Sequence, residues 1–202
     1  GAGVRRGVGT GGKRSGPWGK WFWSAGGAES GMIVRGGAGT GVGIFTEGAL
    51  YRGASSAGEW GHTTEMVDGR TCRCGAKGCL EAYIGGWAIV ARYDELRGRT
   101  PADSGTDLVA RLTAIAEAPS SDASAAQALQ ETTTYIGVGI ANLINLFNPE
   151  RIVVGGWIAE MFEDRHLTWV RAVGYPQELS MRSGAVSARR PLSTPGSSRA
   201  SA

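Results

Sequence analysis

The chain holds one tight group of residues that are typical metal ligands. Its three cysteines and one of its two histidines fall within eighteen residues, at His62, Cys72, Cys74 and Cys79. Four nitrogen and sulfur donors are the number that a tetrahedral structural zinc site requires. Gly75 and Gly78 lie inside the cluster, and glycine tolerates the positive φ that a chain needs when it wraps a small ion. The spacing therefore predicts a zinc-binding loop.

Two other uses of the cysteines stay open on sequence grounds. An odd number of cysteines cannot pair completely, and Cys72 and Cys74 are too close in sequence for an unstrained disulfide. The N-terminus shows no secretory signal pattern, so an oxidising compartment has no support. A free reactive thiol is the second alternative, but three thiols with a histidine ten residues upstream favour a metal.

Charge is distributed unevenly along the chain. Residues 1–31 carry five basic side chains and one acidic, and residues 182–202 carry four basic and none acidic. Residues 32–181 hold 12 Lys and Arg against 17 Asp and Glu, so the net charge of +3 belongs to the ends. A basic balance ordinarily suggests nucleic-acid binding, but the central part is acidic. We predict a folded domain over 32–181, with a Gly/Arg-rich segment 1–31 and a Ser/Arg/Pro-rich tail 182–202 that are disordered or foreign to the fold.

The central part alternates strand and helix signals, which indicates an α/β or α+β domain. Strands are predicted at 32–35, 44–46, 50–52 and 151–154, and the glycine-rich stretch 37–43 is expected to interrupt a hairpin. Helices are predicted at 80–96, 106–117, 123–147 and 159–173. No stretch approaches eighteen apolar residues, so we predict no transmembrane helix and expect a cytoplasmic protein.

Carboxylates and glycines flank the predicted zinc loop. Glu59 and Glu81 could each accept two hydrogen bonds in one plane, which suits the neighbouring hydroxyls of a sugar. The structural alternatives are a surface turn for Glu59 and a favourable first-turn charge for Glu81. Trp60 either stacks on a sugar ring or belongs to the core. The glycines at 37, 39, 41 and 43 either let backbone N–H groups approach a phosphate or serve close packing of a strand.

Taken together, these motifs resemble the ROK family of bacterial repressors and sugar kinases. The resemblance covers about residues 32–172 and rests on Gly39-Thr-Gly-Val-Gly-Ile44, Gly53, Gly58-Glu-Trp-Gly-His62, the run from Cys72 to Glu81, Asn142–Pro149 and Ile152–Gly156. It implies an α/β fold of the actin-like ATPase (ribonuclease-H-like) type. This chain would hold only the C-terminal lobe of that fold, with a zinc-binding loop.

The resemblance also implies roles for single residues. Zinc would be bound by His62, Cys72, Cys74 and Cys79. A sugar pocket would be lined by Glu59, His62 and Glu81. A nucleotide would lie near Gly39, Gly41 and Gly43 with its phosphates, and near Gly155 and Gly156 with its adenosine.

The sequence departs from the kinases of the family in two ways. Ala38 stands where kinases usually carry a threonine. The Asp-x-Gly-x-Thr phosphate motif and the Asn-Asp pair that supplies the base toward the sugar hydroxyl do not occur. Phosphoryl transfer depends on positioning and on that base, so the chain as given is expected not to phosphorylate a sugar. No catalytic residue is assigned to it.

Three functions follow as expectations. The first is a fragment of a sugar-sensing transcriptional regulator, in which bound sugar biases lobe closure in a homodimer that reaches DNA through a domain absent from this chain. The second is a fragment of a glucokinase-like sugar kinase that uses ATP and Mg²⁺. The third is a zinc module that binds nucleic acid, although the Cys/His spacing differs from that of zinc fingers. Ala38 and the sequence motifs around Glu59 and Glu81 favour the regulator.

Overall fold

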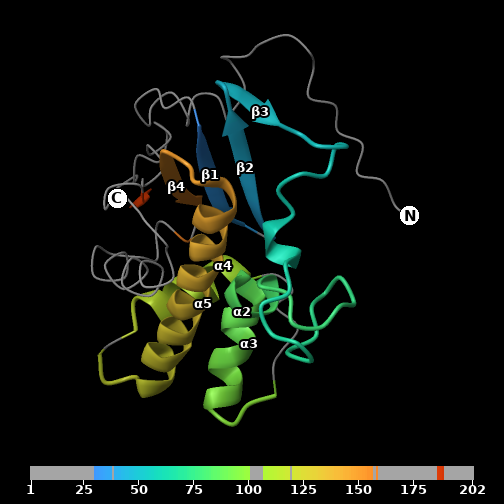
Figure 1. Cartoon of the computed structure of the whole chain (residues 1–202). Helices are drawn as coiled ribbons and strands as arrows, with labels where there is room; N and C mark the ends of the chain where they lie inside the picture. Colours follow the sequence, from blue (N-terminus) through green and yellow to red (C-terminus); the bar gives the residue numbers. More distant parts are fainter. Residues whose placement is uncertain are drawn as a thin grey trace.

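The computed structural model describes residues 30–37, 39–100, 107–118, 120–156, 158 and 186–188. A five-stranded sheet and the helices packed against it make up this part of the chain (Figure 1). In chain order the elements are β1 (Gly31–Gly36), β2 (Thr40–Thr46), β3 (Ala49–Tyr51), the 3-10 turn η1 (Trp60–His62), α2 (Glu81–Ile84), α3 (Gly86–Leu96), α4 (Leu108–Ala116), α5 (Ala123–Phe147), β4 (Arg151–Gly156) and β5 (Val186–Ala188). The helix predicted over 159–173 lies outside the described residues.

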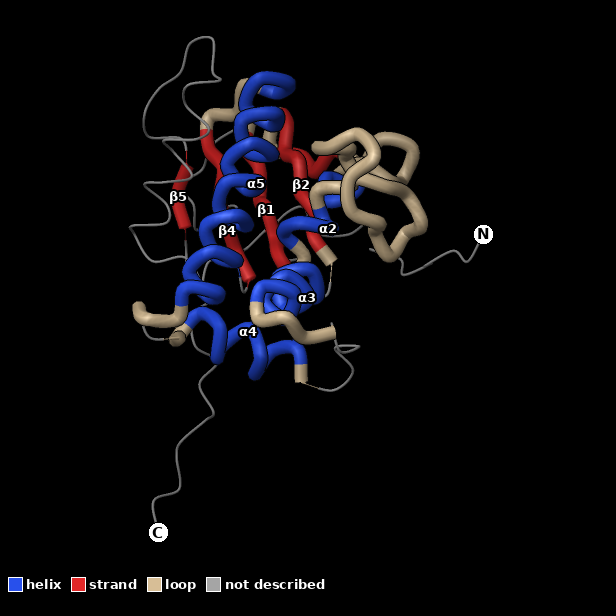
Figure 2. Tube along the Cα trace, turned by 90° about the horizontal axis from the view of Figure 1, so that it is seen from below, coloured by secondary structure: helices blue, strands red, loops and turns tan. Residues whose placement is uncertain are grey.

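The sheet has the strand order β3-β2-β1-β4-β5. Strand β2 runs antiparallel to β1 and β3, whereas β4 is parallel to both β1 and β5. The central strands are near-continuous apolar runs, as expected of strands covered on both faces, and Val34 lies opposite Val154 in the register. Helix α5 crosses one face of the sheet (Figure 2). The predicted ribonuclease-H-like α/β fold is confirmed by this topology.

The expected interruption of the hairpin by the glycine-rich stretch is wrong. Strand β2 passes unbroken through Gly41 and Gly43, which pair with Arg35 and Ile33 of β1. The alternate positions, among them Val42 and Ile44, are buried in the core. Successive strand residues face opposite sides of the sheet, so glycines at every second position remove side chains from only one face. At Gly41 and Gly43, one face of the strand therefore carries no side chains.

The predicted helix 80–96 is two helices. Helix α2 ends at Ile84 and α3 begins at Gly86, because Gly85 adopts an extended conformation with φ −65° and ψ 144°. A Cβ on Gly85 would lie 2.7 Å from the carbonyl oxygen of Glu81, so only glycine fits this close turn. As a result Glu81 opens a short helix of its own beside η1.

Helix α5 matches its prediction in length and in its ends. Asp122 caps its N-terminus by accepting a hydrogen bond from the Ala125 N–H at 3.1 Å, and Asn148 ends it in the left-handed region with φ 44°. The buried stripe comprises Ile136, Ile140, Leu143 and Ile144. Phe147, which follows the same helical spacing, is 45% exposed. No described helix is both long and apolar enough to cross a membrane.

Trp60 joins η1 to the middle of α5. Its ring is only 3% exposed, and its Nε1–H donates to the carbonyl oxygen of Gly139 at 3.2 Å. A Cβ on Gly139 would lie 2.5 Å from the Trp60 ring, so the glycine permits the close approach. Of the two roles open for Trp60, the structure supports the core.

Candidate metal centre

The His/Cys cluster is brought together by backbone pairing between two segments. The residues after η1 run antiparallel to the end of the cysteine loop, with Thr64 opposite Cys79. The Leu80 N–H donates to the carbonyl oxygen of Thr63 at 2.8 Å, which sets His62 beside Cys79. The histidine and the last cysteine, seventeen positions apart in the sequence, are thus neighbours by virtue of main-chain hydrogen bonds.

The cysteine loop closes on itself through a second short pairing. Thr71 lies opposite Lys77, and the Cys72 N–H donates to the carbonyl oxygen of Ala76 at 2.8 Å. Gly75 and Gly78 both have positive φ, 93° and 76°, as predicted. A Cβ on Gly78 would also lie 1.7 Å from the carbonyl oxygen of Met66, so no other residue fits there.

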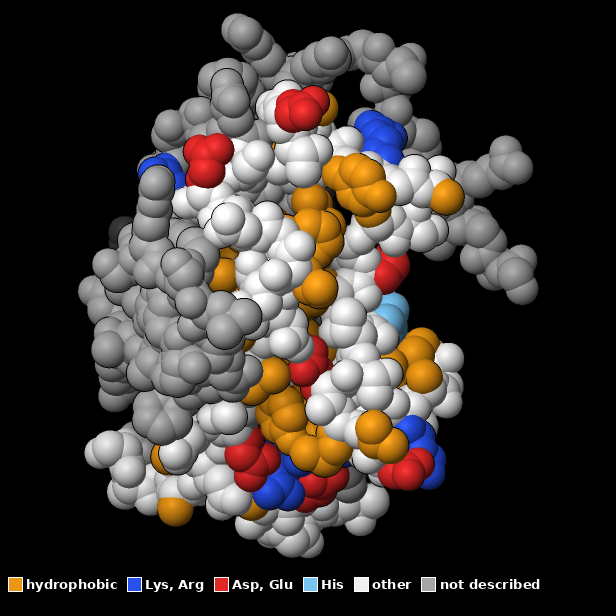
Figure 3. All heavy atoms as spheres, viewed as in Figure 1, with side chains coloured by type: hydrophobic (Ala, Val, Ile, Leu, Met, Phe, Trp, Pro, Cys, Tyr) orange, Lys and Arg blue, Asp and Glu red, His pale blue; other side chains and the backbone are white. Residues whose placement is uncertain are grey.

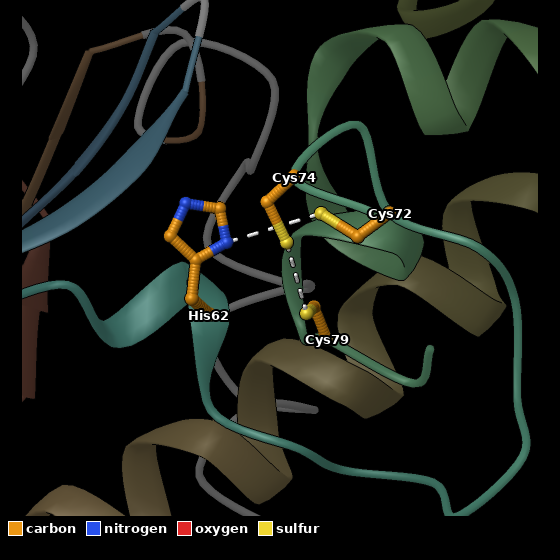
Figure 4. Close-up of side chains that lie close together, drawn as sticks. All are labelled: His62, Cys72, Cys74 and Cys79. Carbon is orange, nitrogen blue, oxygen red and sulfur yellow. Dashed lines mark hydrogen bonds between the residues drawn. The ribbon is translucent and has the colours of Figure 1, made fainter. Parts of the chain in front are cut away.

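The four predicted ligands point toward one another (Figure 4). Their donor atoms all lie within 4.8 Å of one another. The His62 Nδ1 atom is 3.8 Å from Cys72 Sγ, and Cys74 Sγ is 3.7 Å from Cys79 Sγ. Sulfur ligands at about 2.3 Å from a tetrahedral zinc ion are about 3.8 Å apart, so these residues fit such an ion. The cluster is able to bind a metal.

Burial makes metal binding by the thiols depend on the release of their protons. Burial raises the pKa of Cys79 to about 12 and raises the pKa of Cys72 as well. The backbone N–H of Ala76 lowers the pKa of the exposed Cys74. Since thiolates are the ligands and buried thiolates need a positive partner, a metal would offset the burial of Cys72 and Cys79 and release their protons.

His62 presents its two ring nitrogens to different partners. The Nδ1 atom faces the cysteines, and the Nε2 atom lies 4.0 Å from Glu59 Oε2. The Glu59 side chain is 69% exposed. The histidine therefore connects the metal cluster to a carboxylate that is open to solvent.

Glu81, the other predicted sugar ligand, has a structural bond as well. Its side chain is 8% exposed, and its Oε2 accepts a hydrogen bond from the Thr40 N–H at 2.9 Å, at the start of β2. A Cβ on Gly61 would lie 3.2 Å from the same oxygen, so Glu81 packs against η1 beside His62. The structure thus brings Glu59, His62 and Glu81 together around η1. The bond to Thr40 was not predicted, because it joins residues 41 positions apart.

The two glycine segments predicted to lie near a nucleotide meet at one end of the sheet. Gly36 at the end of β1 pairs with Thr40 of β2 and with Gly156 of β4. A Cβ on Gly156 would lie 2.1 Å from the Gly36 carbonyl oxygen. Gly39 precedes β2 at this end, whereas Gly41 and Gly43 lie within the strand. Their nucleotide role stays a prediction.

Beside the cluster lies a groove that the sequence did not reveal. It has a volume of about 580 Å³ and lies between the C-terminal half of α5 and residues 58–65, with apolar side chains along its floor (Figure 3). It is lined by Val42, Ile44, Gly58, Glu59, Trp60, Thr63, Thr64, Glu65, Asn142, Leu143, Asn145, Leu146 and Phe147. The available signal was Leu146, an apolar side chain that lies to one side of the stripe formed by Ile136, Ile140, Leu143 and Ile144.

Comparison with known proteins places these features in a family. The ROK family profile matches residues 14–173. The chain is 31% identical to the xylose repressor of Caldicellulosiruptor bescii, covering 72% of this chain and 39% of the relative. It is 33% identical to the glucokinase of Halalkalibacterium halodurans, covering 69% of this chain and 45% of the relative. The chain therefore spans less than half the length of these two relatives.

Solved structures agree with the sequence comparison. The ROK hexokinase of Thermus thermophilus has a TM-score of 0.67 and 28% identity, over 82% of this chain and 54% of the other. A ROK glucokinase of Streptomyces griseus, solved with glucose and AMPPNP, has a TM-score of 0.65 and 26% identity, over 82% of this chain and 56% of the other. The fold, the His/Cys cluster and the family match agree: this chain belongs to the ROK family.

Proposed function

We propose that this chain is the sugar-binding, zinc-containing lobe of a ROK-family sugar-sensing transcriptional regulator. The observation that carries the proposal is the two-sided placement of His62, with Nδ1 toward the cysteines and Nε2 toward Glu59. A metal held by the cluster would fix the imidazole so that its second nitrogen is available to a ligand. The similarity to a xylose repressor and the Ala38 substitution favour a regulator.

Each residue of the proposed site has a distinct role. His62, Cys72, Cys74 and Cys79 would hold zinc, which supplies a structural cross-link. Glu59 would accept hydrogen bonds from sugar hydroxyls at the exposed side, and His62 Nε2 would offer one more hydrogen bond. Glu81 would accept one from its remaining oxygen while Oε2 keeps its bond to Thr40.

Sugar binding in this lobe would then change the arrangement of the whole regulator. In the proposed regulator the sugar biases lobe closure within a homodimer, and DNA is contacted by a domain outside this chain. We propose a cytoplasmic location. The lobe as given is proposed to be catalytically incomplete.

A sugar kinase is the second candidate. It is supported by the placement of Gly39 and Gly156 at the same end of the sheet and by the similarity to a glucokinase. Binding of a non-hydrolysable ATP analogue with Mg²⁺ to the chain, with loss of affinity on Gly39→Val, would favour the kinase. Absence of nucleotide binding together with sugar binding would favour the regulator.

Calorimetric titration of the zinc-loaded chain with D-glucose, D-xylose and N-acetyl-D-glucosamine tests the proposal. We expect one sugar to bind and Glu59→Gln to weaken its binding by roughly tenfold or more, since a charged hydrogen-bond acceptor is lost. Glu47→Gln, on an exposed turn between β2 and β3, is the matched control and should bind as the parent does. Failure of all three sugars to bind, or equal affinity in Glu59→Gln, would refute this site.

A further inference from the structure

We propose that the ligand is an aryl glycoside: its sugar ring is held at Glu59 and His62, and its apolar aglycone lies in the groove beside α5. The inference rests on the proposed function and narrows its ligand class. Its basis is that one residue, Glu59, belongs both to the carboxylate–imidazole pair and to the wall of the groove. A ligand bound at the pair therefore has the groove at its side.

The groove has the size and the lining of a small-molecule pocket. Its volume of about 580 Å³ falls within the ~300–1,000 Å³ that is usual for such sites. Its lining is mainly apolar and includes Val42 and Ile44 of β2 and Leu143, Leu146 and Phe147 of α5. A sugar ring presents hydroxyls in most directions and does not match such walls, whereas an aromatic ring does.

Polar groups also line the groove. The Asn142 amide donates to Glu65 Oε2 at 3.3 Å, and the Thr63 hydroxyl lies 3.3 Å from Glu65 Oε1. The first of these contacts ties the loop after η1 to α5. Polar groups beside apolar walls suit an aromatic ring with a small polar substituent better than an alkyl chain.

Two of the apolar side chains along the groove, both on α5, are exposed to solvent. Leu146 is 76% exposed and Phe147 is 45% exposed. Contiguous exposed apolar surface on a folded domain marks a binding site for a ligand or a partner. Because Glu59 belongs both to the groove and to the carboxylate–imidazole pair, a ligand is favoured over a protein partner. Packing of the aglycone ring on Phe147 would remove the ring and the Phe147 side chain from water.

The test compares each sugar with its aryl glycoside on the full 202-residue zinc-loaded chain. D-glucose, D-xylose and N-acetyl-D-glucosamine are titrated beside their 4-nitrophenyl α- and β-glycosides. We expect one glycoside to bind at least about tenfold more tightly than its parent sugar, since its ring buries on the order of 100 Å² of apolar surface. Phe147→Ala and, independently, Leu146→Ala should bring the ratio of the two affinities, glycoside over parent sugar, close to one. Val109→Ala, 78% exposed on α4 and outside the groove, should keep it.

The other outcomes separate this inference from the proposed function. If a sugar and its glycosides bind equally, the groove assignment is overturned while the sugar site stands. If the glycoside still binds more tightly than its parent sugar in both Phe147→Ala and Leu146→Ala, the aglycone lies elsewhere and the groove assignment is again overturned. If nothing binds, the proposed function fails and the inference with it. Sedimentation of the same proteins completes the test, because a dimer that Phe147→Ala converts to a monomer would make the groove an interface between two copies.

Discussion

His62 is the residue at which the two proposed chemistries meet. An imidazole that gives one nitrogen to a metal keeps the other for a hydrogen bond, and the partner of that second nitrogen sets the orientation of the ring. Glu59 occupies this place at 4.0 Å. It is thus both the candidate sugar ligand and the group that steadies the histidine, so the metal and the sugar would each influence how tightly the other is held.

The ligand set was predictable from sequence because it is local. His62 and the three cysteines lie close along the chain, and the positive φ of Gly75 and Gly78 follows from their types. The bond from Thr40 to Glu81 was not predictable in this way, because it depends on how the first turn of α2 meets the start of β2. No local pattern records a contact of that kind.

Replacing Cys74 should remove the metal without removing the fold. Cys74 is the exposed cysteine of the cluster, so Cys74→Ser leaves no cavity in the core. We expect the bound zinc, one equivalent per chain in the parent, to fall well below one half, because a neutral hydroxyl is a poor zinc ligand. Elemental analysis of purified protein measures this. Lys77→Ala, in the same loop but outside the cluster, should retain the metal, and equal zinc in both variants would contradict the ligand assignment.

At the scale of elements, an ionic network fastens the metal loop to the helices. Glu131 of α5 accepts two hydrogen bonds of 2.8 Å from Arg92 of α3 and lies 3.6 Å from Arg70 of the loop. Tyr83 of α2 stacks on Tyr135 of α5 at a centroid distance of 4.1 Å, and its hydroxyl accepts from the Arg70 N–H. The loop that carries the cysteines is therefore anchored directly on α2 and α5, and through Glu131 on α3, as well as by the cluster itself.

Elements whose ends and type are set by their own residues were predicted well, and elements that depend on tertiary contacts were not. Helix α5 was predicted closely because its stripe, Asp122 cap and Pro149 stop are all local signals. The break at Gly85 and the continuity of β2 depend instead on what lies across from each glycine. Glycine weakens helix and strand alike, so only the neighbouring elements determine the outcome.

Glu131→Gln should destabilise the fold in a way that depends on pH. The Arg92 guanidinium holds the pKa of Glu131 below its usual value of about 4.3. A carboxylate with a lowered folded pKa contributes stability that is fully present above the unfolded value and disappears as pH falls through the folded one. We expect the variant to lose about 1 kcal/mol at pH 7, because the pair is partly exposed, and a smaller amount as the pH falls below the unfolded pKa of Glu131.

Urea denaturation of parent and variant at several pH values measures this difference. Glu117→Gln, at the exposed end of α4, is the matched control and should follow the parent throughout. A loss from Glu131→Gln of the same size at pH 7 and pH 3 would show that packing, and not the ion pair, is responsible.

For the molecule as a whole, the arrangement of strands places every candidate residue relative to the sheet. The parallel pairing of β1 with β4 joins residues about 120 positions apart, and Ser30 and Glu150 hydrogen-bond at its start. Sequence periodicity identified both strands but not their pairing, because no local pattern records which strands lie side by side. The turn η1 contributes to both sites, because Trp60 lines the groove and His62 belongs to the metal cluster.

Removing zinc should reveal how far the metal controls the rest of the lobe. Without it, two buried thiols and His62 lose the bonds that hold residues 62–80 together, so we expect a lower melting temperature by circular dichroism and sugar binding weakened at least about tenfold by calorimetry. Treatment with a chelator followed by dialysis gives the metal-free chain. Stoichiometric Zn²⁺ should restore both properties, whereas Mg²⁺ should restore neither, because it prefers oxygen ligands. Undiminished sugar affinity in the metal-free chain would show that His62 and Glu59 are positioned by the surrounding fold alone, and the proposed coupling between metal and sugar would be wrong.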